Sequence, residues 1–242
     1  MNRSQPNAIE RDRSHPLNIV ALAGGVGGAK LAQGLAQVLE PEQLTVVVNT
    51  GDDFEHLGLY VAPDLDTVCY TLAGLANPET GWGRAGETWE AMSSVGKLGG
   101  PSWFQLGDRD LGTHLERTRL RREGMALSEI SRRFCEAWGV GPRVVPMSDQ
   151  PVRTIVRTDE GELPFQEYFV HRHCEPCVEG FEFRGAEHAI PAPGVLEALE
   201  AADAVVICPS NPWVSIAPIL AVPGIRASVE RRPTVAVSPI IG

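Results

Sequence analysis

Four aspartates gather at two places where an apolar run gives way to a turn or a helix. Asp52 and Asp53 follow the run 44–49 in the segment NTGDD, and Asp64 and Asp66 follow soon after in PDLDT. Carboxylates that are brought together raise one another's proton affinity unless a cation neutralises them. Mg²⁺ binds such oxygens together with water and substrate phosphate. We therefore expect a magnesium ion on Asp52, Asp53 and Asp66. In the alternative interpretation, Asp64 is a helix N-cap and Asp66 a partner of the helix dipole.

A glycine-rich segment, GGVGGAK, lies between an apolar run at 17–23 and a helical pattern at 29–39. Glycine permits close approach of the backbone, and a helix N-terminus offers free N–H groups to a phosphate. The segment matches neither a P-loop nor a clean GxGxxG. We expect it to hold a phosphate-bearing nucleotide, and a structural tight turn is the alternative. The residues concerned are Gly24, Gly25, Gly27, Gly28 and Lys30.

An Asp-Arg-Asp triplet precedes a basic helical segment in LGDRDLGTHLERTRLRR. Helical spacing places His114, Arg117 and Arg121 near one face, and the arginine fork suits phosphate oxygens. We expect an anionic donor or acceptor to bind here, with Asp108 and Arg109 taking part. A solvated turn with internal ion pairs is the alternative.

Ser210 and Asn211 stand between two prolines, directly after the apolar run 204–208. Polar side chains at the carboxyl end of a strand are well placed to read a base or sugar edge by hydrogen bonds. Turn chemistry alone would also explain them. Cys174 and Cys177 form a single CxxC, for which two ordinary thiols are a better interpretation than a zinc site.

The elements that must position these residues alternate between apolar runs and helical patterns. Buried parallel strands are predicted at 17–23, 44–49, 204–208 and 234–237, helices at 29–39, 66–76, 87–95, 111–122 and 128–138, and short strands at 143–146, 154–157 and 165–170 with a hairpin turn at 159–161. This order predicts an α/β fold, Rossmann-like, with a mostly parallel doubly wound sheet and a helical insertion or cap over about 64–138. We expect one domain over 17–242, preceded by a flexible arm at 1–16. Because SPIIG directly follows an apparent central strand, we expect the C-terminal part of a longer protein to be missing.

Composition excludes several classes of protein. The formal net charge of −10 argues against a nucleic-acid binder, which needs a basic surface. No apolar run is long enough to cross a bilayer, and the N-terminus lacks the apolar core of a secretion signal, so we expect a cytoplasmic protein with no membrane partner. The five cysteines predict buried free thiols rather than a disulfide framework.

Taken in order, these segments resemble the 2-phospho-L-lactate transferase family of coenzyme F-420 biosynthesis. The matching stretches are AGGVGGAKLAQGL, LTVVVNTGDD, PDLDTVCYTLAG, GWG, FQLGDRDLGTHLERT, PMSDQPVRT, FQEYFV, CPSNPWVSIAPIL and VAVSPIIG, which together span Ile19 to Gly242. Each stretch is short, but their combination is highly specific.

The resemblance implies transfer of a phospholactyl or phosphoenolpyruvyl group from a GDP-activated donor to the ribityl hydroxyl of 8-hydroxy-5-deazariboflavin. GMP would be released, Mg²⁺ would be the cofactor, and the enzyme would be a homodimer. On the family pattern Asp66 and Gln105 face the deazaflavin, and the aspartates of the GDD segment lie by the metal. Gln105 stands where related archaeal members carry lysine. The catalytic residues expected from this comparison are Asp66, Asp53 and Arg117, and Asp66 is expected to orient the ribityl hydroxyl.

Two other functions compete with this one. A related branch of the same fold comprises regulatory proteins of the gluconeogenesis-factor type, which bind a nucleotide sugar and need not catalyse. The fold alone does not separate a regulator from an enzyme, because function resides in the site. An NAD-dependent oxidoreductase is the third interpretation, and the acidic loop fits it poorly.

Overall fold

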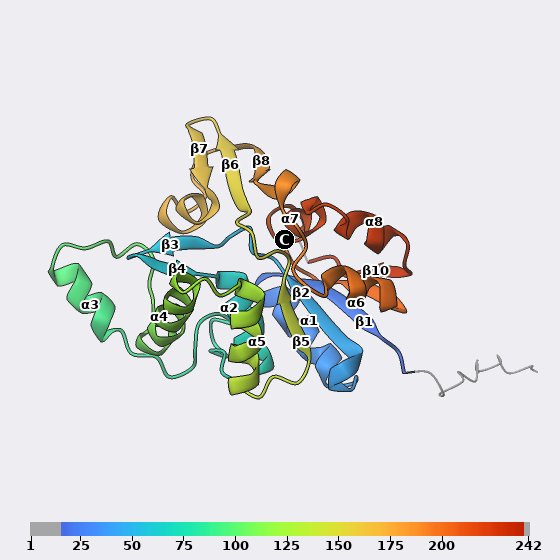
Figure 1. Cartoon of the computed structure of the whole chain (residues 1–242). Coiled ribbons are helices and arrows are strands. Elements are labelled where there is room, and N and C mark those ends of the chain that lie inside the picture. The colour runs from blue at the N-terminus through green and yellow to red at the C-terminus, as the bar shows by residue number, and fades with distance from the viewer. Residues whose placement is uncertain (1–15, 240–242) are drawn as a thin grey trace, which may run out of the picture.

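A five-stranded parallel sheet forms the centre of the computed structural model, which describes residues 16–239 (Figure 1). Its order is β10-β9-β1-β2-β5, and every neighbouring pair is parallel. The strands are β1 (Ile19–Ala23), β2 (Leu44–Val48), β5 (Arg143–Pro146), β9 (Ala204–Ile207) and β10 (Thr234–Ala236). The chain moves outward from β1 through β2 to β5 and then returns to the other side of β1 with β9 and β10. The predicted Rossmann-like, doubly wound sheet is therefore confirmed, with its change of direction between β1 and β9.

Helices cover both faces of this sheet, and the side chains of β1 alternate between the two resulting cores. Ile19, Ala21 and Ala23 belong to one core, and Val20 and Leu22 belong to the other. The first core includes side chains of α1 (Gly25–Ala36), α2 (Pro63–Leu72) and α5 (Leu127–Ala137). The second includes side chains of α6 (Val195–Ala201), α7 (Ala217–Ala221) and α8 (Ile225–Glu230). Burial on both faces explains why these strands are apolar at consecutive positions.

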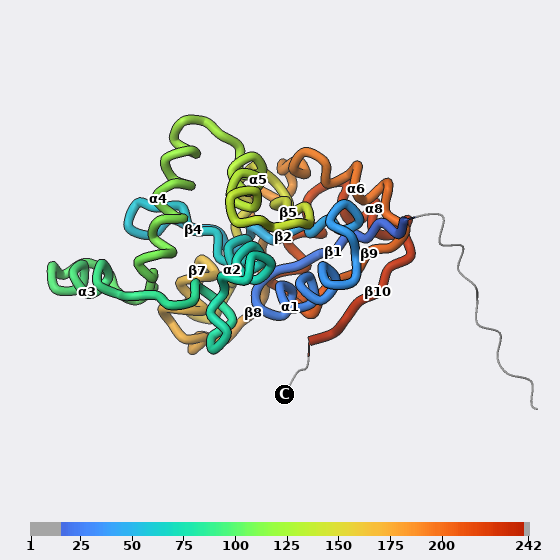
Figure 2. The backbone as a smooth tube through the Cα atoms, turned by 90° about the horizontal axis from the view of Figure 1, so that it is seen from below, coloured from blue at the N-terminus to red at the C-terminus, as the bar shows by residue number. Residues whose placement is uncertain are grey.

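Between β2 and β5 the chain forms a hairpin and four helices. The hairpin is β3 (Phe54–His56) with β4 (Leu59–Val61), and the helices are α2, α3 (Glu90–Lys97), α4 (Asp108–Arg122) and α5. The sequence predicted all four helices but not the hairpin, whose turn residues Leu57 and Gly58 have φ values of 53° and 72°. Leucine seldom adopts this left-handed conformation, so the turn carried no recognisable signal. α3 lies farthest from the central sheet (Figure 2).

A second, antiparallel sheet stands beside the carboxyl ends of the central strands (Figure 1). It consists of β6 (Arg153–Thr158), β7 (Gly161–Pro164) and β8 (Val178–Arg184), in the order β7-β6-β8. The hairpin turn before Gly161 is confirmed, but the strand predicted at 165–170 is wrong. That segment continues into a short π-helix, η2 (Glu167–His171), in which Phe165 and Phe169 stack with ring centroids 5.3 Å apart. Residues four apart lie on one face of a helix, so the stacking of Phe165 on Phe169 favours a helical conformation over the predicted strand.

The last described strand, β10, pairs with β9 alone among residues 16–239, and Val235 is 61% exposed. The apolar run TVAV suggested burial on both faces, but the described part of the chain covers neither face fully. Short turns of helix complete the fold at η1 (Pro41–Gln43), η3 (Ala186–His188) and η4 (Pro212–Ile216). None of the described helices is long and apolar enough to span a membrane. The predicted arm at 1–16 falls outside the described residues apart from Pro16.

Candidate functional site

The glycine-rich segment forms the first turns of α1, not a loop before the helix as the sequence suggested. Its glycines are needed because other parts of the protein press against them. A Cβ atom on Gly27 would lie 2.2 Å from the Pro209 carbonyl oxygen, and one on Gly28 would lie 2.4 Å from Ser210 Oγ. Gly25 adopts a positive φ of 60°, which glycine permits at little cost. The segment therefore fixes how closely α1 approaches the end of β9.

A carboxylate of the protein itself lies at the N-terminus of α1. Asp64, in the first turn of α2, has an oxygen 2.4 Å from where a Cβ on Gly24 would be. Asn49, directly after β2, donates a 2.9 Å hydrogen bond to Asp64 Oδ2. Burial raises the pKa of Asp64 to about 6, although hydrogen bonds from Asn49 and from the backbone of Gly25 oppose the shift. The N-cap of α2 is Ala62, so the N-cap interpretation of Asp64 is wrong.

Asp52 and Asp53 are buried at the carboxyl end of β2, and each has an Oδ1 atom without a hydrogen-bond partner. Burial, with the negative charge of Asp64 as the second cause, raises the pKa of Asp52 well above its usual value. Burial also raises the pKa of Asp53 to about 7, against a 2.7 Å hydrogen bond donated by the Tyr60 hydroxyl. Two adjacent buried carboxyl groups with unpartnered oxygens favour either protons or a cation.

Two arginines flank Tyr60. The Arg121 guanidinium carbon lies 4.2 Å from the centre of the phenol ring, and that of Arg153 lies 5.8 Å from it. Arg153 also lowers the pKa of Asp53 by its charge. Arg121 therefore packs on the residue whose hydroxyl group holds Asp53, and Arg117, one turn earlier on α4, contacts Asp66.

Asp66 is buried and forms an ion pair with Arg117 of α4. Arg117 Nη1 donates to Asp66 Oδ2 at 3.0 Å, and Nη2 contacts Oδ1. Burial by itself lowers the pKa of the Arg117 guanidinium, but the charge of Asp66 outweighs this and the pKa ends above its usual value. Burial in turn raises the pKa of Asp66, against the charge of Arg117. The two contacts show that Arg117 is directed at a carboxyl group of the protein itself.

A small cavity of about 60 Å³ opens beside Asp66. Asp66 and Gln105, the two residues expected to face the acceptor, both line it. The lining also includes Thr67, Tyr70, Trp82, Phe104, Asp110 and His114. The Gln105 side chain is exposed and donates to the Ser102 carbonyl oxygen at 2.6 Å. The structure thus brings the two residues of the expected acceptor site to the same small cavity.

Several other predicted site residues have structural partners. Asp108 accepts hydrogen bonds from the Thr88 hydroxyl and from two backbone N–H groups at the start of α3, which lower its pKa. Arg109 donates to the Ala85 carbonyl oxygen at 2.9 Å. These contacts hold the segment between α2 and α4 against the N-terminus of α4.

Ser210 and Asn211 also make contacts within the protein. Ser210 Oγ accepts a hydrogen bond from the Gly24 N–H at 2.9 Å and donates one to the Gly24 carbonyl at 2.8 Å. Asn211 is exposed and caps the following helical turn by accepting from the Trp213 and Val214 N–H groups. Lys30 is exposed on α1.

The residues predicted to bind Mg²⁺ fit a divalent cation unequally. Asp52 and Asp53 suit a divalent cation, because each carboxyl group has a buried oxygen without a hydrogen-bond partner. A bound cation would favour the ionised form of both groups. Both oxygens of Asp66 face Arg117 instead. Among residues 16–239, the group of three potential ligands with atoms within 4.8 Å of one another is Asp66, Asp110 and His114, of which the sequence had singled out only Asp66 as a ligand.

The expectation that all cysteines are buried is wrong for two of them. Cys69, Cys135 and Cys208 are buried, whereas Cys174 and Cys177 are exposed. Both exposed cysteines lie in the turn that joins η2 to β8, where little of the chain is available to cover them.

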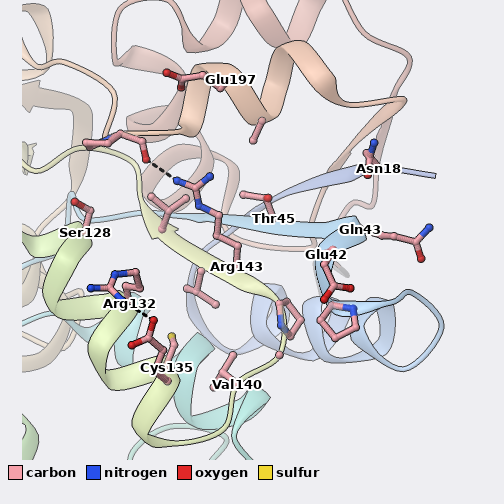
Figure 3. Close-up of a pocket in the computed structure, with 18 of the residues that line it drawn as sticks. Asn18, Glu42, Gln43, Thr45, Ser128, Arg132, Cys135, Val140, Arg143 and Glu197 are labelled. Carbon is pink, nitrogen blue, oxygen red and sulfur yellow. Dashed lines mark hydrogen bonds and ion pairs between the residues drawn. The ribbon is translucent and has the colours of Figure 1, made fainter. Parts of the chain in front are cut away.

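A much larger hollow, of about 1020 Å³, lies at the opposite end of the sheet (Figure 3). It is bordered by the first residues of strands, such as Thr45 and Arg143, and by Arg132 and Cys135 of α5. None of the predicted site residues lines it. We place the chemistry at the carboxyl ends of the strands, because buried carboxyl groups with raised pKa values gather there.

Sequence reasoning missed Asn49, Tyr60, Tyr70 and Asp110 as members of the site. Of these, Asn49 was the easiest to predict from the sequence, because it directly follows a strand in the same segment as Asp52 and Asp53. The tyrosines gave no signal. The hydroxyl partner of Tyr60, Asp53, is brought close by the β3–β4 hairpin, and the partners of Tyr70 lie on α4.

Comparison with known proteins places this arrangement in a family. The model of the family described as "2-phospho-L-lactate transferase CofD" matches residues 19–242. A phosphoenolpyruvate transferase of Kitasatospora aureofaciens is 50% identical over 234 residues, covering 93% of this chain and 73% of the relative. Similar proteins of the same name occur in Thermobifida fusca (46% over 239 residues; 93% and 74% covered) and Mycobacterium tuberculosis (43% over 248 residues; 93% and 75% covered).

The fold also matches a solved structure. A crystal structure of a UPF0052-family protein from Bacillus halodurans superposes with a TM-score of 0.63 at 19% sequence identity, covering 91% of this chain and 67% of that one. At this identity the likeness concerns the fold alone. The sequence matches carry the assignment further, and on their strength the chain belongs to the 2-phospho-L-lactate transferase CofD family and is a transferase by class.

Proposed function

We propose that this protein transfers a phospholactyl or phosphoenolpyruvyl group from a GDP-activated donor to the ribityl hydroxyl of 8-hydroxy-5-deazariboflavin, releasing GMP, in coenzyme F-420 biosynthesis. The name shared by the relatives favours the enolpyruvyl donor. The observation that carries the proposal is that Asp66 and Gln105 line one small cavity, and that Asp66 lies near enough to Asp53 for its charge to raise the pKa of that carboxyl group.

In this reaction the acceptor's hydroxyl oxygen bonds to the phosphorus that carries the three-carbon group. The bond from that phosphorus to the bridging oxygen breaks, and GMP leaves with the electron pair. Such a transfer needs in-line positioning and neutralisation of charge more than covalent help from the protein. We assign Asp66, held by Arg117, to orient the hydroxyl and accept its hydrogen bond. The proton then passes from this carboxylate to solvent.

The region around Asp52 and Asp53 must also accept the diphosphate of the donor. Asp52 and Asp53 would hold Mg²⁺, which neutralises phosphate charge when bound. The guanidinium groups of Arg121 and Arg153 lie over the ring of Tyr60, and the charge of Arg153 acts on Asp53. Their charges support binding of an anionic donor beside the carboxyl groups.

The direct test is a fluorescence titration of 8-hydroxy-5-deazariboflavin with the purified protein, with and without GDP and Mg²⁺. We expect saturable binding that Asp66→Asn weakens and that Glu55→Gln, an exposed carboxylate of β3, leaves unchanged. GMP release from a GDP-linked phosphoenolpyruvate donor should then require the acceptor. Binding of a UDP-sugar without any affinity for the deazaflavin would contradict the proposal and favour a nucleotide-sugar regulator.

A further inference from the structure

We propose that His114 is a positioning residue: its Nδ1 atom accepts a hydrogen bond from Arg117, its other ring nitrogen faces Asp110, and the ring so holds the guanidinium on Asp66. The inference deepens the proposed function, because its consequence for the acceptor rests on Asp66 being the acceptor-orienting residue. The arrangement of His114 itself can be tested without any substrate.

The observations form a continuous chain across α2 and α4. Arg117 Nη1 lies 3.3 Å from His114 Nδ1 and 3.0 Å from Asp66 Oδ2. His114 Nε2 lies 3.3 Å from Asp110 Oδ2. The other oxygen of Asp110 accepts a 2.6 Å hydrogen bond from the Tyr70 hydroxyl. His114 is 1% exposed and Arg117 is 2% exposed, so water does not compete for these contacts.

The chemistry of the two neighbours decides which ring nitrogen carries the proton. A guanidinium group has donors and no acceptor, so the nitrogen that faces Arg117 must accept. The ring proton therefore lies on Nε2, where it points toward the Asp110 carboxylate. A proton on Nδ1 would instead face the arginine N–H at 3.3 Å, and the Asp66 Oδ2 atom lies 3.8 Å from Nδ1, too far to accept a hydrogen bond from it.

The same three side chains, Asp66, Asp110 and His114, come close enough to hold a metal ion. Arg117 already supplies a positive charge to this group through two contacts with Asp66. A divalent cation would have to share the buried space with the guanidinium, which Coulomb repulsion disfavours at low dielectric. We therefore infer a network closed by Arg117 and not a metal centre.

The network borders the small cavity directly, since Asp66, Asp110, His114 and Tyr70 all line it. A carboxylate fixed in one orientation binds a hydroxyl with less loss of entropy than a mobile one. The role of His114 is thus to hold the Arg117 guanidinium in place, and Arg117 in turn fixes the direction of the Asp66 oxygens.

The first experiment uses long-range ¹H–¹⁵N NMR of the histidine-labelled protein without ligands. The sequence contains six histidines, and His114→Asn identifies the resonance that is lost. We expect the Nε2–H tautomer, a changed Nε2 signal in Asp110→Asn, and no coordination of added Zn²⁺ by the ring. An imidazolium, the Nδ1–H tautomer, or direct coordination of Zn²⁺ by the ring would overturn the assignment.

The second experiment separates positioning from mere structural support. Asparagine can place its side-chain oxygen near the Nδ1 position, whereas leucine offers no acceptor. We expect His114→Asn to bind the deazaflavin within about threefold of the unaltered protein, and His114→Leu to bind it about tenfold more weakly or worse. His188→Asn, at an exposed histidine, is the matched control and should change nothing.

Equal losses in His114→Asn and His114→Leu, with circular dichroism and melting temperature retained, would show that the acceptor at Nδ1 does not matter and would overturn the inference. Absence of deazaflavin binding by the unaltered protein would instead contradict the proposed function. The NMR measurement still decides the state of His114 in that case, so the two failures are distinguishable.

Discussion

Asn49 donates a 2.9 Å hydrogen bond to Asp64, and this bond joins the carboxyl end of β2 to the first turn of α2. The same amide group donates to the Val214 carbonyl at 3.2 Å, and its oxygen accepts from the Gly51 N–H at 2.8 Å. One buried side chain thus connects three segments that carry the candidate site, and it opposes the burial-induced rise in the pKa of Asp64.

Asn49→Ala should destabilise the protein, because the substitution removes one of the donors to the buried Asp64 carboxyl group and leaves the Gly25 backbone N–H and Ser215. We expect a loss of roughly 1–3 kcal/mol in the free energy of unfolding. The folded-state pKa of Asp64, already about 6, should rise further. The penalty is then larger at pH 8, where Asp64 must ionise, than at pH 5. Urea unfolding at both pH values measures the difference, and a loss independent of pH would contradict this explanation.

Asp53→Asn should stabilise the protein at alkaline pH. The pKa of Asp53 is raised from 3.8 to about 7 in the folded state, so the folded protein retains a proton that the unfolded chain releases between these values. The group therefore costs nothing below about pH 4 and lowers stability progressively as the pH rises to 7. We expect a gain of at most about 4 kcal/mol at pH 8 and little change at pH 4.

Chemical unfolding across this pH range, in the presence of EDTA, checks the prediction, with Glu55→Gln as the exposed control. Added Mg²⁺ should raise the melting temperature of the unaltered protein more at pH 8 than at pH 6, because it competes with protons for Asp52 and Asp53. A magnesium effect that persists in the Asp52→Asn/Asp53→Asn double variant would place the ion elsewhere.

Gly27→Ala and Gly34→Ala should have opposite effects although both lie in α1. A Cβ on Gly27 would lie 2.2 Å from the Pro209 carbonyl oxygen, so α1 would have to move away from the end of β9. No atom lies within 4 Å of a Cβ on Gly34. We expect Gly27→Ala to lower stability by roughly 1–3 kcal/mol and Gly34→Ala to raise it by up to about 1 kcal/mol. Thermal unfolding of the two variants side by side is the measurement, and a similar effect from both would show that contact with Pro209 is unimportant.

Arg117→Met should be strongly destabilising, because it leaves the Asp66 carboxylate buried without its partner. The expected loss is roughly 3–5 kcal/mol. Adding Asp66→Asn should recover part of this stability, since the unpaired charge is then absent. Arg119→Met, on the exposed side of the same helix, removes only surface ion pairs and should have no measurable effect. Failure of the double variant to recover stability would indicate that packing of the arginine, and not its charge, is what matters.

The sequence alone determined β1, β2, β9 and β10 of the central sheet and the helices α1 to α5. Runs such as 19–23 and 44–48 are apolar at consecutive positions because helices cover both faces of the sheet. This pattern can be recognised in the sequence without knowing which elements are neighbours. It also placed Asp52, Asp53 and Asp66 at one end of the sheet, because parallel strands end on the same side. The motif order was specific enough to indicate the family.

Tertiary structure decided what each site residue does. Whether Asp66 is free for a metal depends on Arg117, which lies 51 residues away in sequence and meets it only when α4 packs near α2. Whether the glycines approach a ligand or the protein depends on Pro209 and Ser210, which are joined to them through the pairing of β1 with β9. Local spacing carries information about one element at a time, whereas a hydrogen bond or a buried charge is decided by the distance between two elements, and that distance is set by packing of the whole core.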